Sequence, residues 1–369
     1  MSTPDIAIEV NNIKFENPFV VASGPPGTNK ATIRKAFDEG WGGMIAKTVS
    51  LDNTKVINVA PRYGKLYSRV NNEVIGFQNI ELISDRPLEN WLTEFDELKK
   101  KYPNRVLIAS IMEEYNKDNW QRLVKMIQET GVDGFELNFS CPHGLPERKM
   151  GMAMGNNPEI VEEVTRWVTS VAKVPVWAKM TPNITDITVP ARSAIKGGAH
   201  GISAINTILA VIGVDLETLR PMPTVQGHSI PGGYSAQAVR PIALRQVMEL
   251  ARALPKNVSL SGMGGVENSQ DAIQFMLLGA STVQACTAPM LQGFGMVKEL
   301  CEGLKNFMQK HDFKTVREFV GKSLPYFTTH AHLVELRDQA KETQAKATSR
   351  DTEWSGEKIT EQTKNLAIN

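Results

Sequence analysis

The sequence predicts an α/β fold, a TIM (β/α)8 barrel with inserted loops and a polar C-terminal extension. Three observations support this prediction: eight short apolar runs recur along the chain, stretches of helical character separate them, and polar or reactive residues follow seven of the runs. The helical stretches are long enough to cross back over a sheet, as parallel strands require. A doubly wound open sheet is the alternative that the same alternation permits.

The apolar runs and the helical stretches alternate in chain order. The expected strands are 19–22, 44–48, 106–112, 134–138, 176–180, 201–206, 258–261 and 282–285. The clearest helical stretches are 28–39, 120–129, 158–171, 236–253 and 269–278. Pro158 follows two asparagines, as a first-turn proline follows a helix cap, and Gly131, Gly197 and Gly279 stand where helices should end.

Two long insertions and a polar tail interrupt this regularity. Residues 50–86 follow the second strand and residues 208–235 follow the sixth, and long ordered loops of this kind tend to be lids or binding loops. Beyond about Leu333 the chain is polar and mostly lacks an apolar face. We therefore expect a barrel domain at 1–332 and a C-terminal helix with an extended arm at 333–369 that can pack on a partner subunit.

Charge and cysteine content exclude several classes of protein. The 41 basic and 40 acidic side chains nearly cancel, so neither nucleic acid nor an anionic membrane is an expected partner. The N-terminal residues lack a targeting pattern and no apolar run approaches the ~18 residues of a membrane span, which predicts a cytoplasmic protein. Three widely spaced cysteines fit neither a disulfide framework nor a metal or iron–sulfur ligand set. Redox chemistry would need another cofactor.

Reactive residues gather where the expected strands end. The chemistry of a TIM barrel is found at this edge, the C-terminal face of the strands. The residues in question are Ser23 and Gly24, Lys47 and Thr48, Asn138 to Cys141, Lys179, Asn206 and Thr207, Gly264 and Gly265, and Cys286 and Thr287. A strand-end lysine is usually solvated and a glycine pair is common in turns, but seven coincidences favour a site.

Cys141 is the residue whose placement is most informative. Pro142 and Gly144 forbid continuing the strand 134–138, so Cys141 belongs to a loop at the C-terminal end of that strand. A thiol there can move a proton. The alternative is a buried cysteine that acts as a small hydrophobe, which is the commoner role of this residue type.

The glycine pairs and two lysines suggest a phosphate-bearing cofactor. Gly264 and Gly265 after the seventh strand, with Gly233 and Ser235 at the end of the second insertion, offer bare backbone and a hydroxyl to a phosphate. Lys47 and Lys179 could place positive charge beside a flavin ring and stabilise its anionic reduced form. A Gly-x-Gly-x-x-Gly fingerprint follows none of the strands.

The loop 138–144, with Glu147-Arg148 and Met150-Gly151 after it, resembles the active-site loop of dihydropyrimidine dehydrogenase. The stretch 77–84 is a second specific match, and shorter ones include 36–42, 108–112, 178–183 and 240–245. The resemblance covers roughly residues 10–310, the flavin-binding barrel that this family shares with class 1 dihydroorotate dehydrogenases.

The resemblance implies an FMN-dependent oxidoreductase that interconverts a pyrimidine base, uracil or thymine, and its 5,6-dihydro form. Cys141 would be the general acid that protonates C5 as reduced FMN delivers hydride to C6. The residues implied to bind the pyrimidine are Asn79, Asn138, Asn206 and Thr207. Those implied to bind FMN are Ala22, Ser23, Gly24, Lys47, Thr48 and Lys179, with Gly233, Ser235, Gly264, Gly265, Cys286 and Thr287 around its phosphate.

Some positions depart from the family pattern or have a simpler interpretation. The family's ferredoxin-type cysteine cluster has no counterpart, so we expect electrons to come from a partner, an NAD(P)H flavoprotein or an iron–sulfur protein. We also expect a homo-oligomer. A barrel acting on dihydroorotate or another heteroaromatic ring, or a partner-dependent flavin-binding subunit, is the alternative. His143 and Glu147 are interpreted as loop-ordering residues, Glu136 and Met154 as packing residues, and Cys301 as part of the core.

Overall fold

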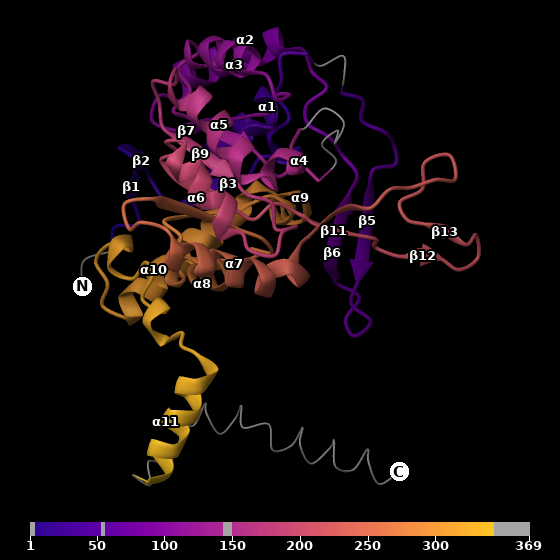
Figure 1. Cartoon of the computed structure of the whole chain (residues 1–369). Coiled ribbons are helices and arrows are strands. Elements are labelled where there is room, and N and C mark those ends of the chain that lie inside the picture. Colours follow the sequence, from indigo (N-terminus) through magenta and orange to yellow (C-terminus); the bar gives the residue numbers. More distant parts are fainter. Residues whose placement is uncertain (1–3, 53–55, 143–149, 343–369) are drawn as a thin grey trace. The chain divides into compact units, whose positions relative to one another are not determined.

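Eight parallel strands close into a barrel, which confirms the predicted TIM fold and excludes the open sheet. The computed structural model describes residues 4–52, 56–142 and 150–342. The strands of the barrel are β3 (Phe19–Val21), β4 (Gly43–Ile45), β7 (Val106–Ile111), β8 (Gly134–Asn138), β9 (Val176–Lys179), β10 (Gly201–Ala204), β15 (Ser259–Met263) and β16 (Thr282–Ala285). Their order around the barrel is β10-β15-β16-β3-β4-β7-β8-β9, and β10 pairs with β9 to close it. Figure 1 labels β3, β7 and β9 among these strands.

Burial on both faces explains why these strands are nearly continuous apolar runs. Every residue of β7 and of β8 is buried, although β8 contains a glutamate and an asparagine. The strand β4 is shorter than predicted, because the chain turns out of the ladder at Ala46 to place Lys47 and Thr48 at its end. The strand β10 likewise ends at Ala204, before Asn206.

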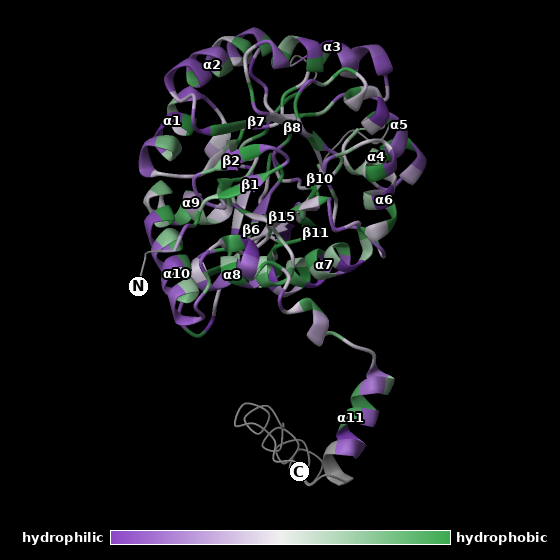
Figure 2. Ribbon diagram, turned by 90° about the vertical axis from the view of Figure 1, so that its left-hand side faces the viewer, coloured by the Kyte–Doolittle hydropathy of each residue, from purple (hydrophilic) through white to green (hydrophobic). Residues whose placement is uncertain are grey.

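A ring of helices covers the outside of the barrel, with apolar faces inward and hydrophilic faces outward (Figure 2). These helices are α1 (Lys30–Glu39), α2 (Leu88–Lys101), α3 (Lys117–Gln128), α5 (Pro158–Thr169), α6 (Thr188–Lys196), α7 (Arg240–Ala253), α8 (Ser269–Leu277) and α10 (Val297–Lys310). The helix α5 begins as predicted, because the side chain of Asn157 accepts hydrogen bonds from the N–H groups of Glu159 and Ile160. The helix α7 begins later than predicted, since Ala236 has a φ of 76°.

Shorter helical segments fill the connections. They are the α-helices α4 (Met152–Gly155) and α9 (Thr287–Gln292) and the 3-10 helices η1 (Pro25–Gly27), η4 (Gln237–Val239), η5 (Phe294–Met296), η6 (Val316–Glu318) and η7 (Leu324–Tyr326).

An N-terminal hairpin supplies a side chain to the barrel interior. The strands β1 (Ile8–Val10) and β2 (Ile13–Phe15) pair antiparallel through Asn11 and Asn12, whose φ angles are 51° and 63°. Asparagine tolerates this left-handed conformation, which a two-residue hairpin turn requires. Phe15 is only 2% exposed and packs inside the barrel.

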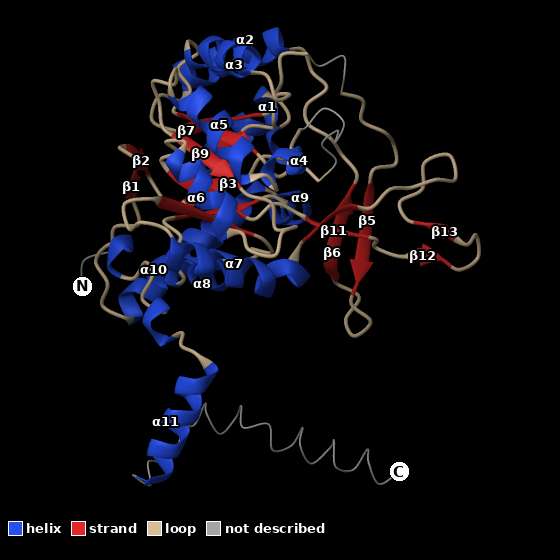
Figure 3. Ribbon diagram, viewed as in Figure 1, coloured by secondary structure: helices blue, strands red, loops and turns tan. Residues whose placement is uncertain are grey.

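The two insertions, expected as long loops, form antiparallel strands instead (Figure 3). The first contributes β5 (Tyr63–Tyr67) and β6 (Val74–Asn79), and the second contributes β11 (Ile208–Ala210) and β14 (Gly232–Ser235). They make one four-stranded sheet in the order β11-β14-β6-β5, because Phe77 to Asn79 pair with Gly233 to Ser235. We call this the inserted sheet. A separate small hairpin joins β12 (Val214–Asp215) to β13 (Arg220–Pro221).

The chain divides into a first unit at 1–324 and a second at 325–369. The described part of the second unit is mainly α11 (His330–Glu342). The domain boundary predicted between 332 and 333 falls within this helix and stays a prediction. The predicted arm beyond residue 342 lies outside the described residues. None of the helices in the described ranges has the length and apolar content that crossing a lipid bilayer needs.

Candidate active site

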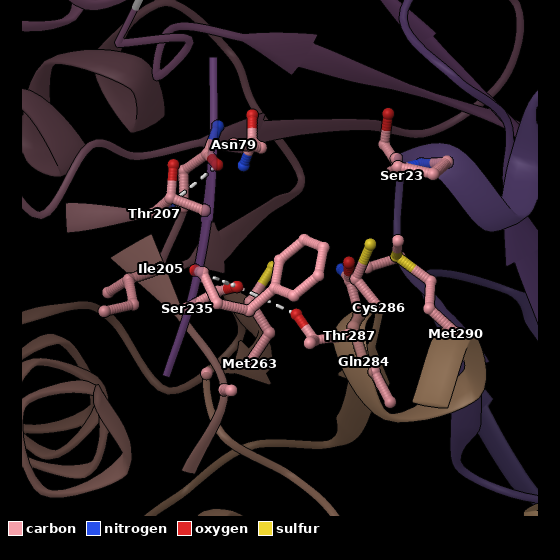
Figure 4. A pocket seen from close by; sticks show the side chains of 18 of the residues that line it. Ser23, Asn79, Ile205, Thr207, Ser235, Met263, Gln284, Cys286, Thr287 and Met290 are labelled. Carbon is pink, nitrogen blue, oxygen red and sulfur yellow. Dashed lines mark hydrogen bonds between the residues drawn. The ribbon is translucent and has the colours of Figure 1, made fainter. Parts of the chain in front are cut away.

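One cavity opens at the C-terminal ends of the barrel strands, beneath the inserted sheet. It holds about 1120 Å³ of space, some of it open to solvent, and its wall includes every predicted site residue except Gly233. The barrel and the inserted sheet both contribute side chains: Ser23, Gln284 and Cys286 come from barrel strands or their ends, and Asn79 and Ser235 come from the sheet (Figure 4). The convergence of polar groups on one large concave space is what a ligand site requires.

Gly233 supports the site from behind the wall. It is buried, and its carbonyl oxygen accepts a hydrogen bond from Nδ2 of Asn79 at 3.3 Å. A Cβ at this position would lie 2.1 Å from Oγ1 of Thr207. Only glycine therefore allows β14 to approach both Asn79 and Thr207 so closely.

The two lysines at the cavity are both buried and both paired with carboxylates. Nζ of Lys47 lies 3.1 Å from Oε2 of Glu81, and Nζ of Lys179 lies 3.5 Å from Oε1 of Glu136. The side chains of all four residues are at most 7% exposed. Both lysines line the cavity, and their charge is offset by neighbours that the sequence did not indicate.

Cys141 lies in the loop after β8, three residues beyond the last residue of that strand, and lines the cavity. Its side chain is 6% exposed and contacts a small apolar cluster with Ile83, Met112 and Met150. Its backbone N–H donates to Oδ1 of Asn138 at 3.0 Å, which fixes the thiol residue against the end of β8. Cys141 thus lines the cavity in a largely buried setting, which suits a group proposed to transfer a proton.

Ser140 joins two of the predicted substrate-binding amides. Its hydroxyl donates to Oδ1 of Asn138 at 3.0 Å and accepts from Nδ2 of Asn206 at 2.8 Å. Nδ2 of Asn138 donates in turn to Oγ1 of Thr48, which lies 2.8 Å from the hydroxyl of Ser110. Both amides are therefore held in fixed orientations before any ligand arrives.

The opposite wall has the features that a phosphate-bearing planar cofactor needs. Gly264 and Gly265 have φ angles of 129° and 71°, and a Cβ on Gly265 would lie 2.7 Å from the carbonyl oxygen of Ala236. A Cβ on Gly24 would lie 2.5 Å from Sγ of Cys286. Bare backbone thus lines this end of the cavity, beside the hydroxyls of Ser235 and Thr287, which lie 2.9 Å apart (Figure 4).

Two titratable groups on the wall are held neutral at ordinary pH. Burial raises the pKa of Cys286 to about 11, although Lys179 and Lys47 act in the opposite direction. Burial and the nearby Glu81 carboxylate raise the pKa of Tyr63 to about 12. The hydroxyl therefore keeps its proton, which it donates in a hydrogen bond to Glu81 at 3.0 Å. Cys286 is therefore a packing thiol rather than a reactive one.

Sequence reasoning missed Glu81, Ser140 and Gln284, and it treated Glu136 as packing. One signal was available for Glu136, because it precedes Asn138 by two residues in a strand and must face the same side. Glu81 gave no such signal, since its place depends on the pairing of the insertions. Met154 is buried, and Cys301 packs against the core from α10, as predicted. His143 and Glu147 lie outside the described residues.

The barrel strand ends and the inserted sheet together bring Cys141, three asparagine amides and two lysines to one cavity, an arrangement suited to a cofactor-dependent oxidoreductase. The family model for dihydroorotate dehydrogenase matches residues 5–308. The chain belongs to the dihydroorotate dehydrogenase family, whose dehydrogenases bind FMN.

Three curated relatives give a finer view of the similarity. The chain is 55% identical to the "Dihydropyrimidine dehydrogenase (NADP(+)), chloroplastic" of Arabidopsis thaliana, over 100% of this chain and 89% of the relative. It is 41% identical to the "NAD-dependent dihydropyrimidine dehydrogenase subunit PreA" of Escherichia coli K12, over 87% of this chain and 77% of the relative. It is 36% identical to the "Dihydroorotate dehydrogenase B (NAD(+)), catalytic subunit" of Pyrococcus furiosus, over 86% of this chain and 98% of the relative.

Proposed function

We propose that the chain is an FMN-dependent oxidoreductase acting on CH–CH bonds, which interconverts uracil or thymine and its 5,6-dihydro form. The relatives named as dihydropyrimidine dehydrogenases support this function. The observation that carries it is the single cavity in which Cys141, Asn79, Asn138, Asn206, Lys47 and Lys179 meet.

Cys141 is the proton donor of the reductive direction. FMN, when bound, supplies the hydride that is added at C6 of the pyrimidine. The thiol of Cys141 gives its proton to C5, so that the ring gains one hydride and one proton and the C5–C6 double bond becomes single. In the oxidative direction the thiolate takes the proton from C5.

The amides orient the ring through their N–H groups. Oδ1 of Asn138 already accepts from the N–H groups of Ser140 and Cys141 and from the Ser140 hydroxyl, so it is saturated. One N–H of Asn138 donates to Thr48, and one N–H of Asn206 donates to Ser140. The second N–H of each amide is left to donate to a ring carbonyl of the pyrimidine.

The remaining wall residues hold FMN. Ala22, Ser23 and Gly24 with Lys47, Thr48 and Lys179 would contact the ring system, while Gly264, Gly265, Ser235, Cys286 and Thr287 would surround the phosphate, and Gly233 would support them from behind. The bare backbone at Gly24 and Gly265 supports this assignment, because a side chain at either position would clash with its neighbours.

The charges on the wall favour an uncharged base over dihydroorotate. Among the described residues of the wall, the cations are Lys47 and Lys179, and each is paired with a carboxylate. A substrate carboxylate would have to compete for one of them. We therefore expect the kcat/KM for dihydrouracil or dihydrothymine to exceed that for dihydroorotate, and the opposite order would favour dihydroorotate as substrate.

The first experiment is the absorbance spectrum of the purified protein, followed by turnover with an artificial electron acceptor. Flavin absorbance, with reduction of the flavin by dihydrouracil, is the expected result. Protein that is colourless and cannot take up FMN would overturn the proposed function. Flavin that dihydrouracil fails to reduce would overturn the substrate alone.

We also propose an electron-transfer partner and a homo-oligomeric assembly. The name of the Escherichia coli relative describes it as a subunit, which supports a partner. In this proposal 1–332 is the FMN domain and 333–369 the docking extension, so deletion of the residues after Leu333 abolishes association and leaves the flavin spectrum unchanged. An unaltered complex would exclude the extension as the docking element.

The prediction of a cytoplasmic protein is part of the same proposal. The Arabidopsis relative is chloroplastic by its name, so a fluorescent fusion imaged in the source cells should be compared with chloroplast and cytosolic markers. A fusion that coincides with the chloroplast marker would contradict the prediction.

A further inference from the structure

A buried carboxylate lies inside the barrel, one layer below the cavity. Glu136 is on β8, is fully buried, and faces the barrel interior together with Ser203, Ser261 and Gln284. It does not line the cavity, whereas Lys179 and Gln284 do. Lys179 and Gln284 are therefore the contacts that connect Glu136 with the cavity.

The strand register explains how Glu136 reaches Lys179. Residues 138 and 179 are direct partners in the parallel pair of β8 and β9, and Glu136 is two residues deeper on the same face of β8 as Asn138. Nζ of Lys179 lies 3.5 Å from Oε1 of Glu136. The ammonium of Lys179 thus lies between the cavity and the carboxylate of Glu136, which is deeper in the barrel.

Gln284 holds the carboxylate from the other side. Its Nε2 lies 3.2 Å from Oε2 of Glu136 and 2.9 Å from the hydroxyl of Ser261, to which Thr282 also donates. These contacts join three barrel strands, β8, β15 and β16. The carboxylate has a fixed position as a result, and so does the charge that faces Lys179.

Structural stability alone does not explain this arrangement. Burying a carboxylate costs several kcal/mol even after relaxation, and well-packed apolar residues are often as stable as a buried ion pair. Among the described residues, Oε1 of Glu136 has no hydrogen-bond partner, and its ion pair with Lys179 is long for a hydrogen bond. A costly and incompletely bonded charge beneath a site suggests a functional role.

The second lysine gives a contrast. Glu81, which pairs with Lys47, lies on the cavity wall and is bonded to the hydroxyl of Tyr63, so it can touch a ligand itself. Glu136 has no such access. Its ion-pair partner is Lys179, which is expected beside the FMN ring.

We propose that Glu136 is a positioning residue that acts through Lys179 and sets the reduction potential of FMN. It draws the ammonium of Lys179 toward the barrel interior and offsets part of its charge, so that the cation favours the anionic reduced flavin less strongly than it would alone. The inference rests on the proposed placement of FMN over Lys179.

The test is the midpoint potential of bound FMN, measured by equilibrium reduction against a reference dye. The Glu136→Gln variant keeps the shape of the side chain and removes its charge, so Lys179 is no longer offset. We expect the ratio of reduced to oxidised FMN at a fixed potential to rise by about tenfold, which is about 30 mV for a two-electron couple. The matched control is Glu249→Gln, which removes a carboxylate from a surface pair with Arg245 and should leave the potential unchanged.

The route through Lys179 is tested by a double-mutant cycle. Lys179→Met should lower the potential, and adding Glu136→Gln to it should then change nothing further. A Glu136→Gln potential equal to that of the wild type, or the same shift with and without Lys179, would overturn the proposal. If the Lys179→Met variant had the same potential as the wild type, Lys179 would have no effect on the flavin, and the proposal would be overturned as well.

A milder variant covers the case in which Glu136→Gln gives no soluble protein. Glu136→Asp keeps the charge and withdraws it by one methylene, so the potential should shift in the same direction by a smaller amount. An unchanged potential in this variant would count against the proposal. Wild-type protein that does not bind FMN would instead defeat the proposed function, and the two failures are therefore distinct.

Discussion

The barrel and the inserted sheet build opposite parts of one cavity by different means. The barrel supplies Cys141, Asn138 and Lys179 from the ends of strands whose places are fixed by parallel neighbours on both sides. The inserted sheet supplies Asn79 and Glu81 at or just beyond the end of a single strand, β6, which reaches the cavity only by pairing with β14. The proposed proton donor is thus on the more constrained part, and one of the four proposed substrate contacts, Asn79, is on the less constrained part.

Substitutions in the two parts should therefore have different effects on the protein. A change in the barrel wall should lower the rate of the chemical step or the stability of the fold. A change in the inserted sheet should mainly weaken ligand binding, because it displaces Asn79 while the thiol and the lysines keep their barrel supports. The following predictions test this division, from the largest expected effect to the smallest.

Replacing the proton donor should have the largest effect. Cys141→Ala is expected to keep its bound flavin and lose turnover by about 10² to 10⁴-fold, the usual contribution of a general acid. The measurement is kcat with dihydrouracil, with the flavin spectrum as control for loading. Full activity would exclude the acid role and would assign the chemistry to another group.

Raising the pH should destabilise the barrel wall through Cys286. The thiol of the unfolded chain loses its proton near pH 9, whereas burial raises the pKa in the folded chain to about 11. Between these values the folded state holds a proton that the unfolded state has lost, so the free energy of unfolding should fall as pH rises, by about 3 kcal/mol in all.

Denaturant unfolding of Cys286→Ser at pH 8 and pH 11 isolates this contribution. The wild type should lose more stability than the variant across that interval, since the hydroxyl does not titrate there. Equal losses in the two proteins would show that the wall around Cys286 is more hydrated than the structure indicates.

Crowding the inserted sheet should weaken substrate binding. Gly233→Ala places a Cβ 2.1 Å from Oγ1 of Thr207, so β14 must shift and take Asn79 with it. We expect a KM increase of about tenfold, or about 1.4 kcal/mol, which is within the usual cost of overpacking. The flavin spectrum should be unchanged.

Gly213→Ala is the matched control, because its Cβ would meet only the flexible end of Met222 at 3.1 Å. It should leave KM and kcat near their wild-type values. A Gly233→Ala variant that lowered kcat and left KM unchanged would contradict the proposed division between the two parts of the cavity.

Removing the link between the two parts should have the smallest effect. The hydroxyl of Ser235 donates to the carbonyl oxygen of Phe77 at 3.1 Å and lies 2.9 Å from Oγ1 of Thr287, at the end of β16. Ser235→Ala is expected to weaken FMN binding by a few-fold, about 1 kcal/mol, because two hydrogen bonds with modest net value are lost. Titration of apo-protein with FMN measures this, and an unchanged affinity would remove Ser235 from the phosphate region.

The barrel and most of the residues at the C-terminal ends of its strands could be predicted from the amino-acid sequence. Parallel strands buried on both faces must be apolar, and the helices between them must be amphipathic, so both patterns are visible in one dimension. A residue at or just past the end of a barrel strand, such as Lys179 or Cys141, must then lie at the mouth. Fourteen of the predicted residues reach the cavity for this reason, whereas Asn79 and Ser235 reach it from the inserted sheet and Gly233 lies just behind the wall.

Two features became visible only in the folded structure. One is the pairing of Lys47 and Lys179 with carboxylates, and the other is the sheet that the two insertions form. The pairing of Asn79 with Gly233 joins segments that no local pattern connects, and it brings Glu81 to Lys47. Glu136 was visible as a carboxylate in a buried strand, yet its contact with Lys179 depends on the register of β8 against β9. Periodicity can be seen within a single segment, whereas register and long-range pairing depend on two segments at once. The ion pairs of this site depend on how two segments pair, so the sequence pattern alone does not predict them.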